Sequence, residues 1–278
     1  MGRARDIHPL TAGIDLAADP AKTAAAVLVW APERIRVTEL VLPCTDADVV
    51  RLVRRAHLDT DSAVGVDCAL GWPEPFVSFV AAAQDGLAHP PPGEAAAWRR
   101  SLAYRATDEF ARRVTGRPPL SVSTDRLGLV AMRLASILAQ VRVEGVEVHK
   151  DARPPLFEVY PGAALRLWGF ATRRYRVSEE VRAGIVAELE RRLPTLELGE
   201  HRIRCIEVDH ALDAVVAALV ARAALRGRFH DVPDALRASA RREGWMVLPE
   251  GPLEALGAAA VSGDHVGSAD GGEAGEHD

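Results

Sequence analysis

The stretch LTAGIDLAADPAKTAAAVLVWAPERIRVTELVL, residues 10–42, decides the fold. It contains three segments rich in Val, Ile, Thr and Leu, a composition typical of β-strands. Two turn signals, Asp19-Pro20 and Ala31-Pro32, separate the segments. Because such short connections join neighbouring antiparallel strands, we expect a three-stranded meander with strands at residues 10–17, 23–31 and 35–42.

A helix and further strands follow the meander. Asp46 is a candidate N-cap, and residues 47–58 carry apolar side chains at helical spacing. Residues 62–70, SAVGVDCAL, form a short apolar run of the kind found in buried parallel strands. Residues 155–160, PLFEVY, predict another strand. We therefore expect an α/β fold with a mixed five-stranded sheet, an antiparallel meander followed by parallel strands, flanked by helices.

The rest of the chain is mainly helical in pattern. Residues 74–150 predict a helical insert, interrupted by proline-rich segments. Beyond the insert and residues 155–160 we expect helices at 178–193 and 209–225, a last strand at 203–208 and a short extended segment at 244–249. These elements fit one domain over residues 1–258.

The last twenty positions differ in composition. Residues 259–278 contain five acids and no Lys or Arg, so we expect a disordered acidic tail. Without these five acids, the Asp and Glu count falls from 39 to 34 and equals the 34 Lys and Arg residues. The body is then neutral, without the basic footprint of a general nucleic-acid binder.

Hydropathy and cysteine content indicate the cellular location of the protein. No run of apolar residues is long enough to predict a membrane span, and no apolar h-region of a signal peptide follows the N-terminus. The three cysteines, Cys44, Cys68 and Cys205, are far apart and include no CxxC pair. A cytoplasmic location and no thiolate zinc site are therefore expected.

Two strands carry an acid where apolar residues are expected. Asp15 lies in Gly13-Ile14-Asp15-Leu16, and Asp67 lies in Val64-Gly65-Val66-Asp67. A carboxylate in a buried strand needs a partner such as a metal ion or a buried Arg, although an Asp at a strand end also caps turns. Neighbouring parallel strands would bring both carboxylates to one edge of the sheet.

The segment Asp209-His210-Ala211-Leu212-Asp213-Ala214 opens the last strong helix. His210 and Asp213 are three residues apart and share one face. Small Ala214, Ala217 and Ala218 would let this helix approach the sheet closely. Asp209 is readily explained by capping and by the helix dipole, whereas Asp213 lies a full turn inside.

Other charged residues have more than one interpretation. Glu158 in PLFEVY is a candidate metal ligand, a residue that orients a ligand, or the partner of a buried Arg. Arg105 and Asp108 are weak candidates for substrate binding, because their spacing by itself favours an ordinary surface ion pair. The arginines of the insert either meet a phosphate backbone or form a solvated helix face; they are Arg99, Arg100, Arg105, Arg112, Arg113 and Arg117.

Clustered carboxylates suit phosphodiester cleavage. Two divalent ions roughly 4 Å apart activate a water and neutralise the leaving oxygen. Mg²⁺ and Mn²⁺ prefer oxygen ligands and keep several waters, so three or four carboxylates suffice. A neighbouring His can bind the metal or shuttle a proton.

Five short motifs, in order, resemble one protein family: GID, GVDCALGWP, YRATD, EVYP and DHALDA. The chain is similar to the predicted nucleases of the RNase H-like fold grouped as domain of unknown function 429, and more distantly to RuvC-type resolvases. The resemblance covers roughly residues 10–250. Resolvases commonly have Glu at the position of Asp67, which puts the geometry there in doubt.

The resemblance implies a site and a function. Asp15, Asp67 and Asp213 would bind Mg²⁺ or Mn²⁺, His210 would assist, and Glu158 would complete the catalytic set, with Asp108 as a family-specific addition. The expected function is a metal-dependent nuclease acting on DNA or RNA. The sequence does not indicate the oligomeric state of the protein, and a homodimer is one of the alternatives.

Two other functions remain as alternatives. One is a non-catalytic nucleic-acid-binding or regulatory protein with the same fold, although a degenerate site would tolerate the loss of one acid. The other is a phosphotransferase related to sugar kinases and actin-like ATPases. That class needs two such domains around a nucleotide cleft, and only one is visible in the pattern.

Overall fold

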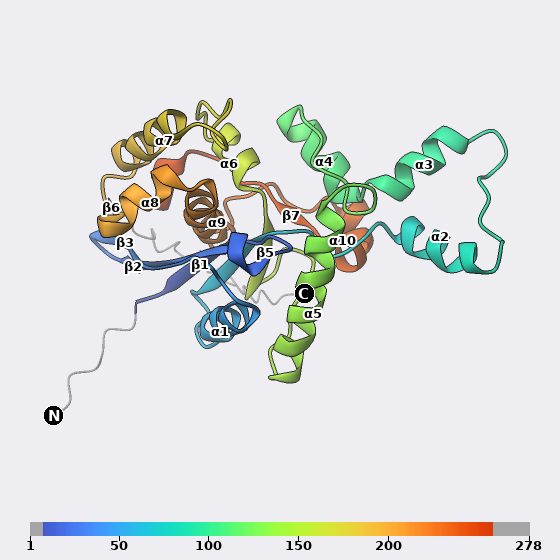
Figure 1. Ribbon diagram of the computed structural model, residues 1–278, viewed down its shortest axis with the longest axis horizontal. Coiled ribbons are helices and arrows are strands. Elements are labelled where there is room, and N and C mark those ends of the chain that lie inside the picture. Colours follow the sequence, from blue (N-terminus) through green and yellow to red (C-terminus); the bar gives the residue numbers. More distant parts are fainter. Residues whose placement is uncertain (1–7, 258–278) are drawn as a thin grey trace, which may run out of the picture.

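A mixed seven-stranded sheet organises the chain (Figure 1). The computed structural model describes residues 8–257, so the predicted acidic tail lies outside the described residues. In chain order the strands are β1 (Leu10–Asp15), β2 (Ala24–Ala31), β3 (Arg34–Val41), β4 (Ala63–Asp67), β5 (Leu156–Val159), β6 (Leu196–Glu197) and β7 (Met246–Val247).

The strand order is β6-β3-β2-β1-β4-β5-β7. β1 pairs antiparallel with β2 and β2 with β3, while β4 is parallel to β1 and β5 is parallel to β4. The predicted fold class, an antiparallel meander followed by parallel strands, is confirmed. Two-residue strands β6 and β7 extend the expected five strands at both edges, and β7 lies within the predicted extended segment 244–249.

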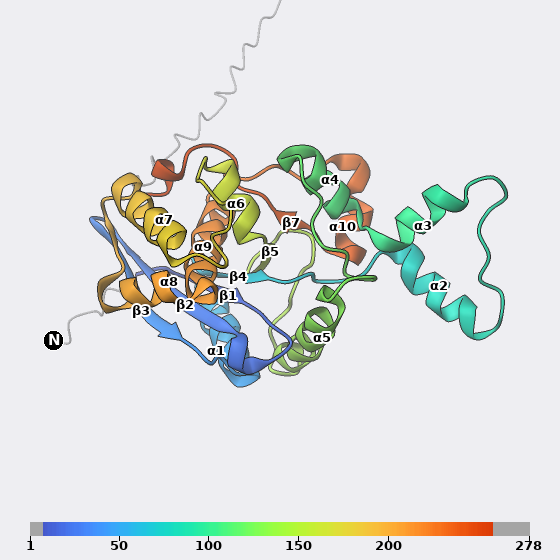
Figure 2. The ribbon, with the colours of Figure 1, turned by 45° about the horizontal axis from the view of Figure 1, so that its top comes forward.

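Helices cover both faces of the sheet (Figures 1 and 2). In chain order they are α1 (Asp46–His57), α2 (Glu74–Gln84), α3 (Ala95–Ala103), α4 (Ala106–Thr115), α5 (Leu127–Val143), α6 (Pro161–Leu167), α7 (Glu179–Arg192), α8 (Arg202–Glu207), α9 (Asp209–Leu225) and α10 (Arg237–Glu243). The helices α6 to α9 pack on one face, and α1 and α5 pack on the other.

The central helix α9 lies between the sheet and the outer helices. Every residue from Ala211 to Ala224 is buried, and all of them except Asp213 and Arg222 are apolar, as expected for a helix buried on all sides. α9 contacts β1, β2, β4 and β5, and its other side contacts α6 and α8. This placement brings the start of α9 to the edge of the sheet where β1 and β4 end.

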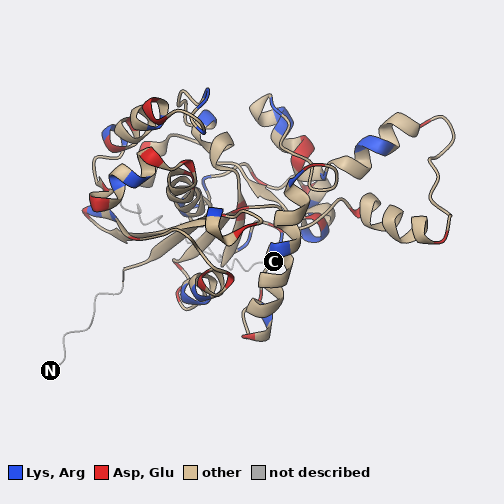
Figure 3. Cartoon of the chain, viewed as in Figure 1, with Lys and Arg blue, Asp and Glu red and all other residues tan. Residues whose placement is uncertain are grey.

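The segment between β4 and β5 contains the helices α2 to α5. α5 packs against α1 and contributes Leu134 and Ile137 to the core. In contrast, α2 and α3 extend away from the sheet in both views (Figures 1 and 2), joined by an edge-to-face contact of Phe79 with Trp98. α2 carries few charges (Figure 3).

No helix of residues 8–257 is long and apolar enough to cross a membrane.

Two local predictions are wrong. Residues 203–208 do not form a strand, because they lie almost entirely in α8, with Cys205 buried and Ile203 exposed. Six residues are too few to distinguish a strand period from a helix period, and packing against α7 and α9 decides. Asp46 is not the N-cap of α1: Thr45 is, and it forms a capping box with Asp48.

Candidate metal centre

The parallel pairing of β1 and β4 places two carboxylates side by side. Asp15 is the last residue of β1, Asp67 is the last residue of β4, and the two are register partners. Register partners on neighbouring strands direct their side chains to the same face of a sheet. The expectation that both acids reach one sheet edge is therefore met.

The third carboxylate comes from α9, which approaches the sheet closely. A Cβ atom at Gly13 would lie 1.9 Å from the carbonyl oxygen of Ala214, and one at Gly65 would lie 2.5 Å from that of Ala217. Only glycine in the strands, opposite alanines in the helix, permits this approach. Asp213, one turn into α9, thereby reaches the carboxyl ends of both strands.

The three acids form one cluster. Asp15, Asp67 and Asp213 each offer a carboxylate oxygen, and these three oxygens lie within 4.8 Å of one another. Asp15 is 9% exposed and Asp213 is 2% exposed. Three hard oxygen donors gathered from three separate elements fit Mg²⁺ or Mn²⁺, which retain waters at their remaining positions.

Burial and mutual repulsion perturb these acids. Burial, and then the charge of Asp15, raises the pKa of Asp213 to about 7, while Arg176 acts in the opposite direction. The pKa of Asp67 is raised well above its usual value, first by burial and then by Asp15 and Asp213. A bound cation would relieve the repulsion that these shifts record.

Two residues that the sequence did not single out complete the surroundings of Asp213. The Tyr175 hydroxyl donates to Asp213 Oδ1 at 3.0 Å and lies 3.2 Å from Oδ2. Arg176 Nη2 lies 3.4 Å from Asp213 Oδ2 and 4.0 Å from Asp67 Oδ2. Both residues lie in the segment before α7, where the arginine-rich run RRYRVS at 173–178 is the only signal.

His210 contacts the cluster from the first turn of α9. Its Nδ1 atom lies 2.5 Å from Asp15 Oδ2, and its side chain is 34% exposed. The hydrogen bond to Asp15 raises the pKa of His210, because the carboxylate favours the protonated ring. Asp209, the first residue of α9, is not among the clustered carboxylates.

Glu158 pairs with a buried arginine rather than joining the three acids. Arg105 Nη2 donates to Glu158 Oε1 at 2.7 Å, and Arg105 Nη1 donates to Oε2 at 2.9 Å. Arg105 also forms a two-pronged pair with Asp108, at 3.1 and 2.9 Å. The structure shows Glu158 as the partner of a buried Arg and not as a member of the cluster of three acids.

The ion pair of Arg105 with Asp108 is not on the surface. Both residues are 1% exposed, so the surface interpretation is wrong, and the burial also argues against direct substrate binding. The reason is tertiary: β5 brings Glu158 beside α4, which no local spacing encodes. Other arginines of the insert are exposed, and two of them, Arg100 and Arg112, pair with Glu109.

This buried network holds the segment that follows Asp67. Glu158 Oε2 accepts from the backbone amide of Leu70 at 2.9 Å. Gly244 packs against the same carboxylate. Its φ is +96°, and a Cβ atom there would lie 3.0 Å from Glu158 Oε2. Arg105 and Glu158 are therefore positioning residues for the end of β4.

Fold and site together define a mixed α/β protein with a buried cluster of three carboxylates suited to a divalent cation. The chain belongs to the family described as "Protein of unknown function (DUF429)", whose family model matches residues 13–237. The matched range includes Asp15, Asp67 and Asp213. No curated protein and no solved structure matches the chain. The family description names no activity, so the nuclease and its nucleic-acid partner stay predictions.

Proposed function

We propose that this chain is a divalent-metal-dependent nuclease that hydrolyses phosphodiester bonds of DNA or RNA. Asp15, Asp67 and Asp213 would hold Mg²⁺ or Mn²⁺. The observation that carries the proposal is the convergence of three carboxylates, from two strand ends and one helix, to within 4.8 Å. Bound there, the metal would supply an activated water and neutralise charge on the leaving oxygen.

The residues around the cluster have roles that fit this chemistry. His210 is partly exposed and hydrogen-bonded to Asp15, so it can hold or move a proton at the edge of the site. The Arg176 side chain is 48% exposed, and its Nη2 atom lies within 4.0 Å of carboxylate oxygens of Asp67 and Asp213. A guanidinium there can pair with a phosphate oxygen of the substrate, because its planar fork matches that group.

The first experiment tests the metal site without any assumption about substrate. The melting temperature of the metal-free protein is measured with and without Mn²⁺ for the wild type, Asp15→Asn and Asp209→Asn. We expect Mn²⁺ to raise the melting temperature of the wild type and of Asp209→Asn, which lies outside the cluster, but not of Asp15→Asn. Equal shifts in all three proteins would contradict the metal site.

The second experiment tests the reaction. Wild-type protein and Asp67→Asn are incubated with branched DNA, single-stranded DNA and RNA in the presence of Mg²⁺ or Mn²⁺. We expect cleavage of at least one substrate by the wild type only. Mn²⁺ binding without cleavage of any of them would instead favour the alternative, a non-catalytic nucleic-acid-binding protein.

A further inference from the structure

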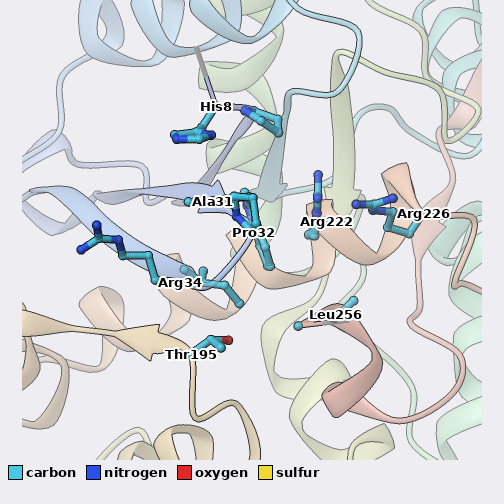
Figure 4. Close-up of a pocket in the computed structure, with 12 residues that line it drawn as sticks. His8, Ala31, Pro32, Arg34, Thr195, Arg222, Arg226 and Leu256 are labelled. Carbon is cyan, nitrogen blue, oxygen red and sulfur yellow. The ribbon is translucent and has the colours of Figure 1, made fainter. Parts of the chain in front are cut away.

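A second polar site lies at the opposite end of α9 from the carboxylates. A pocket of about 260 Å³ opens where the residues before β1, the β2–β3 turn and the last turn of α9 meet (Figure 4). Arg222 is nine residues beyond Asp213, or about 13 Å along a helix, so the pocket is separate from the acidic cluster.

The titratable side chains that line this pocket are three arginines and one histidine. Arg222 lies in the last turn of α9, Arg226 follows the end of that helix, Arg34 begins β3, and His8 precedes β1. In Figure 4, Arg222 and Arg226 lie side by side, whereas Arg34 stands on the far side of Pro32. Among the described lining residues there is no Asp or Glu. The pocket therefore favours an anion.

Arg222 is buried without a counter-ion. The residue is 6% exposed, and its Nε atom is buried and has no hydrogen-bond partner within residues 8–257. Its guanidinium stacks over Trp30, 4.7 Å from the ring centroid, which supplies attraction but no acceptor. Burial, and then the charge of Arg226, lowers the pKa of Arg222 to about 10.

Ordinary helix chemistry explains only part of this arrangement. Cations are favoured in the last turn of a helix, and a long side chain can bury its stem while its head stays in water. That account suffices for the exposed Arg226. It does not supply an acceptor for the buried Nε of Arg222. The nearby carboxylates of Asp59 and Asp61 raise the pKa of Arg222, but neither forms an ion pair with it among the described residues. A buried charge without a partner is unfavourable.

We propose that this pocket binds the terminal phosphate group of a small molecule, held by Arg222 and Arg226. A guanidinium fork matches phosphate oxygens, and two neighbouring cations suit a group that carries up to two negative charges. Such a ligand would give acceptors to the Nη atoms of Arg222, which form no hydrogen bond with the described residues and, unlike the Nε atom, are not among the fully buried donors. This inference is independent of the proposed nuclease activity.

The test is a calorimetric titration of the metal-free protein with inorganic phosphate in a buffer of low chloride. We expect saturable binding by the wild type. In Arg222→Met and in Arg226→Gln we expect the affinity for phosphate to fall by about tenfold or more. Arg204→Met, a change at an exposed arginine of α8, serves as the matched control and should bind like the wild type. No binding by the wild type, or equal binding by all four proteins, would overturn the proposal.

Two further measurements sharpen the result. Arg222→Met should melt at the same temperature as the phosphate-free wild type or higher, because it removes an unpaired buried charge. If it unfolds instead, the exposed Arg226→Gln still tests the site. Adenosine 5′-monophosphate should compete with phosphate, whereas an oligonucleotide with hydroxyls at both ends should not. Equal competition by that oligonucleotide would show a nucleic-acid backbone surface and overturn the assignment of a terminal phosphate.

Discussion

Asp15 and Asp67 are register partners on the parallel strands β1 and β4, so the two carboxylates stand beside each other at the sheet edge. Two residues before each acid the strand carries a glycine, Gly13 or Gly65, and these glycines also pair in register. The glycines allow α9 to lie close to the sheet, and α9 in turn positions Asp213 beside the other two acids. The pattern of glycine, apolar residue and acid thus encodes both the ligands and the space that the third ligand needs.

Replacing Gly13 by Ala tests this close approach. The new Cβ would lie 1.9 Å from the Ala214 oxygen and 2.3 Å from the Ala218 nitrogen, both backbone atoms, so α9 would have to move. We expect a loss of about 3 kcal/mol or more in the free energy of unfolding, measured by urea denaturation.

Gly184→Ala is the matched control. Gly184 lies in α7, and a Cβ there meets nothing within 4 Å. Alanine favours a helix over glycine by roughly 0.5–1 kcal/mol, so this variant should be more stable than the wild type. A Gly13→Ala protein that is as stable as the wild type would show that α9 lies farther from β1 than described.

The buried network makes a second prediction. Arg105→Met leaves Glu158 and Asp108 buried without their cation, which costs roughly 3–5 kcal/mol of stability. Adding Glu158→Gln to the same chain should recover part of this loss, since one unpaired charge disappears. Arg191→Met, which removes an exposed pair with Glu188, should cost at most about 1 kcal/mol. Urea denaturation of the four proteins would measure these differences.

A variant of Glu158 distinguishes a residue that supports the site from a residue that binds the metal. Its carboxylate is engaged by Arg105 and by the Leu70 amide, and it is not one of the three clustered acids. We therefore expect Glu158→Gln to retain the rise in melting temperature caused by Mn²⁺, although its starting temperature is lower. Loss of the rise in a Glu158→Gln protein that remains folded would show that metal binding requires the Glu158 carboxylate.

The sequence predicts those parts of the fold and the site that follow a local pattern. Asp15 and Asp67 are recognisable because an acid interrupts an apolar strand, and Asp213 because it lies too far inside its helix to be a cap. Tyr175 and Arg176 have no such signal, since they lie in an irregular segment whose position depends on α6 and α7. The pairing of Arg105 with Glu158 joins residues 53 apart in the chain, so only tertiary packing reveals it.

Tyr175→Phe tests the contact that the sequence did not indicate. The hydroxyl hydrogen bond favours the charged form of Asp213, so its removal raises the pKa of Asp213 further and weakens metal binding near pH 7. Loss of a group that orients a ligand typically lowers metal affinity by about tenfold or more. Competition with a fluorescent chelator would measure Mn²⁺ affinity. Tyr104→Phe, which keeps the ring that contacts Arg100, should bind as the wild type does.

The last prediction concerns the stability of the metal-free protein as a function of pH. The pKa of Asp213 rises from 3.8 to about 7 on folding, so between these values the folded chain binds more protons than the unfolded chain. The stabilisation is complete below about pH 4 and is lost as the pH rises through about 7. Asp67 and His210 are shifted in the same direction.

Asp213→Asn removes the titrating group and keeps an oxygen that can accept from Tyr175. Its free energy of unfolding relative to the wild type should therefore increase from pH 4 to pH 7, by at most about 1.4 kcal/mol per pH unit, and level off above pH 7. Urea denaturation at several pH values checks this. Asp231→Asn, at an exposed position, should give a profile parallel to the wild type. Parallel profiles for Asp213→Asn and the wild type would show that Asp213 is ionised throughout this range and that the carboxylates do not repel one another as described.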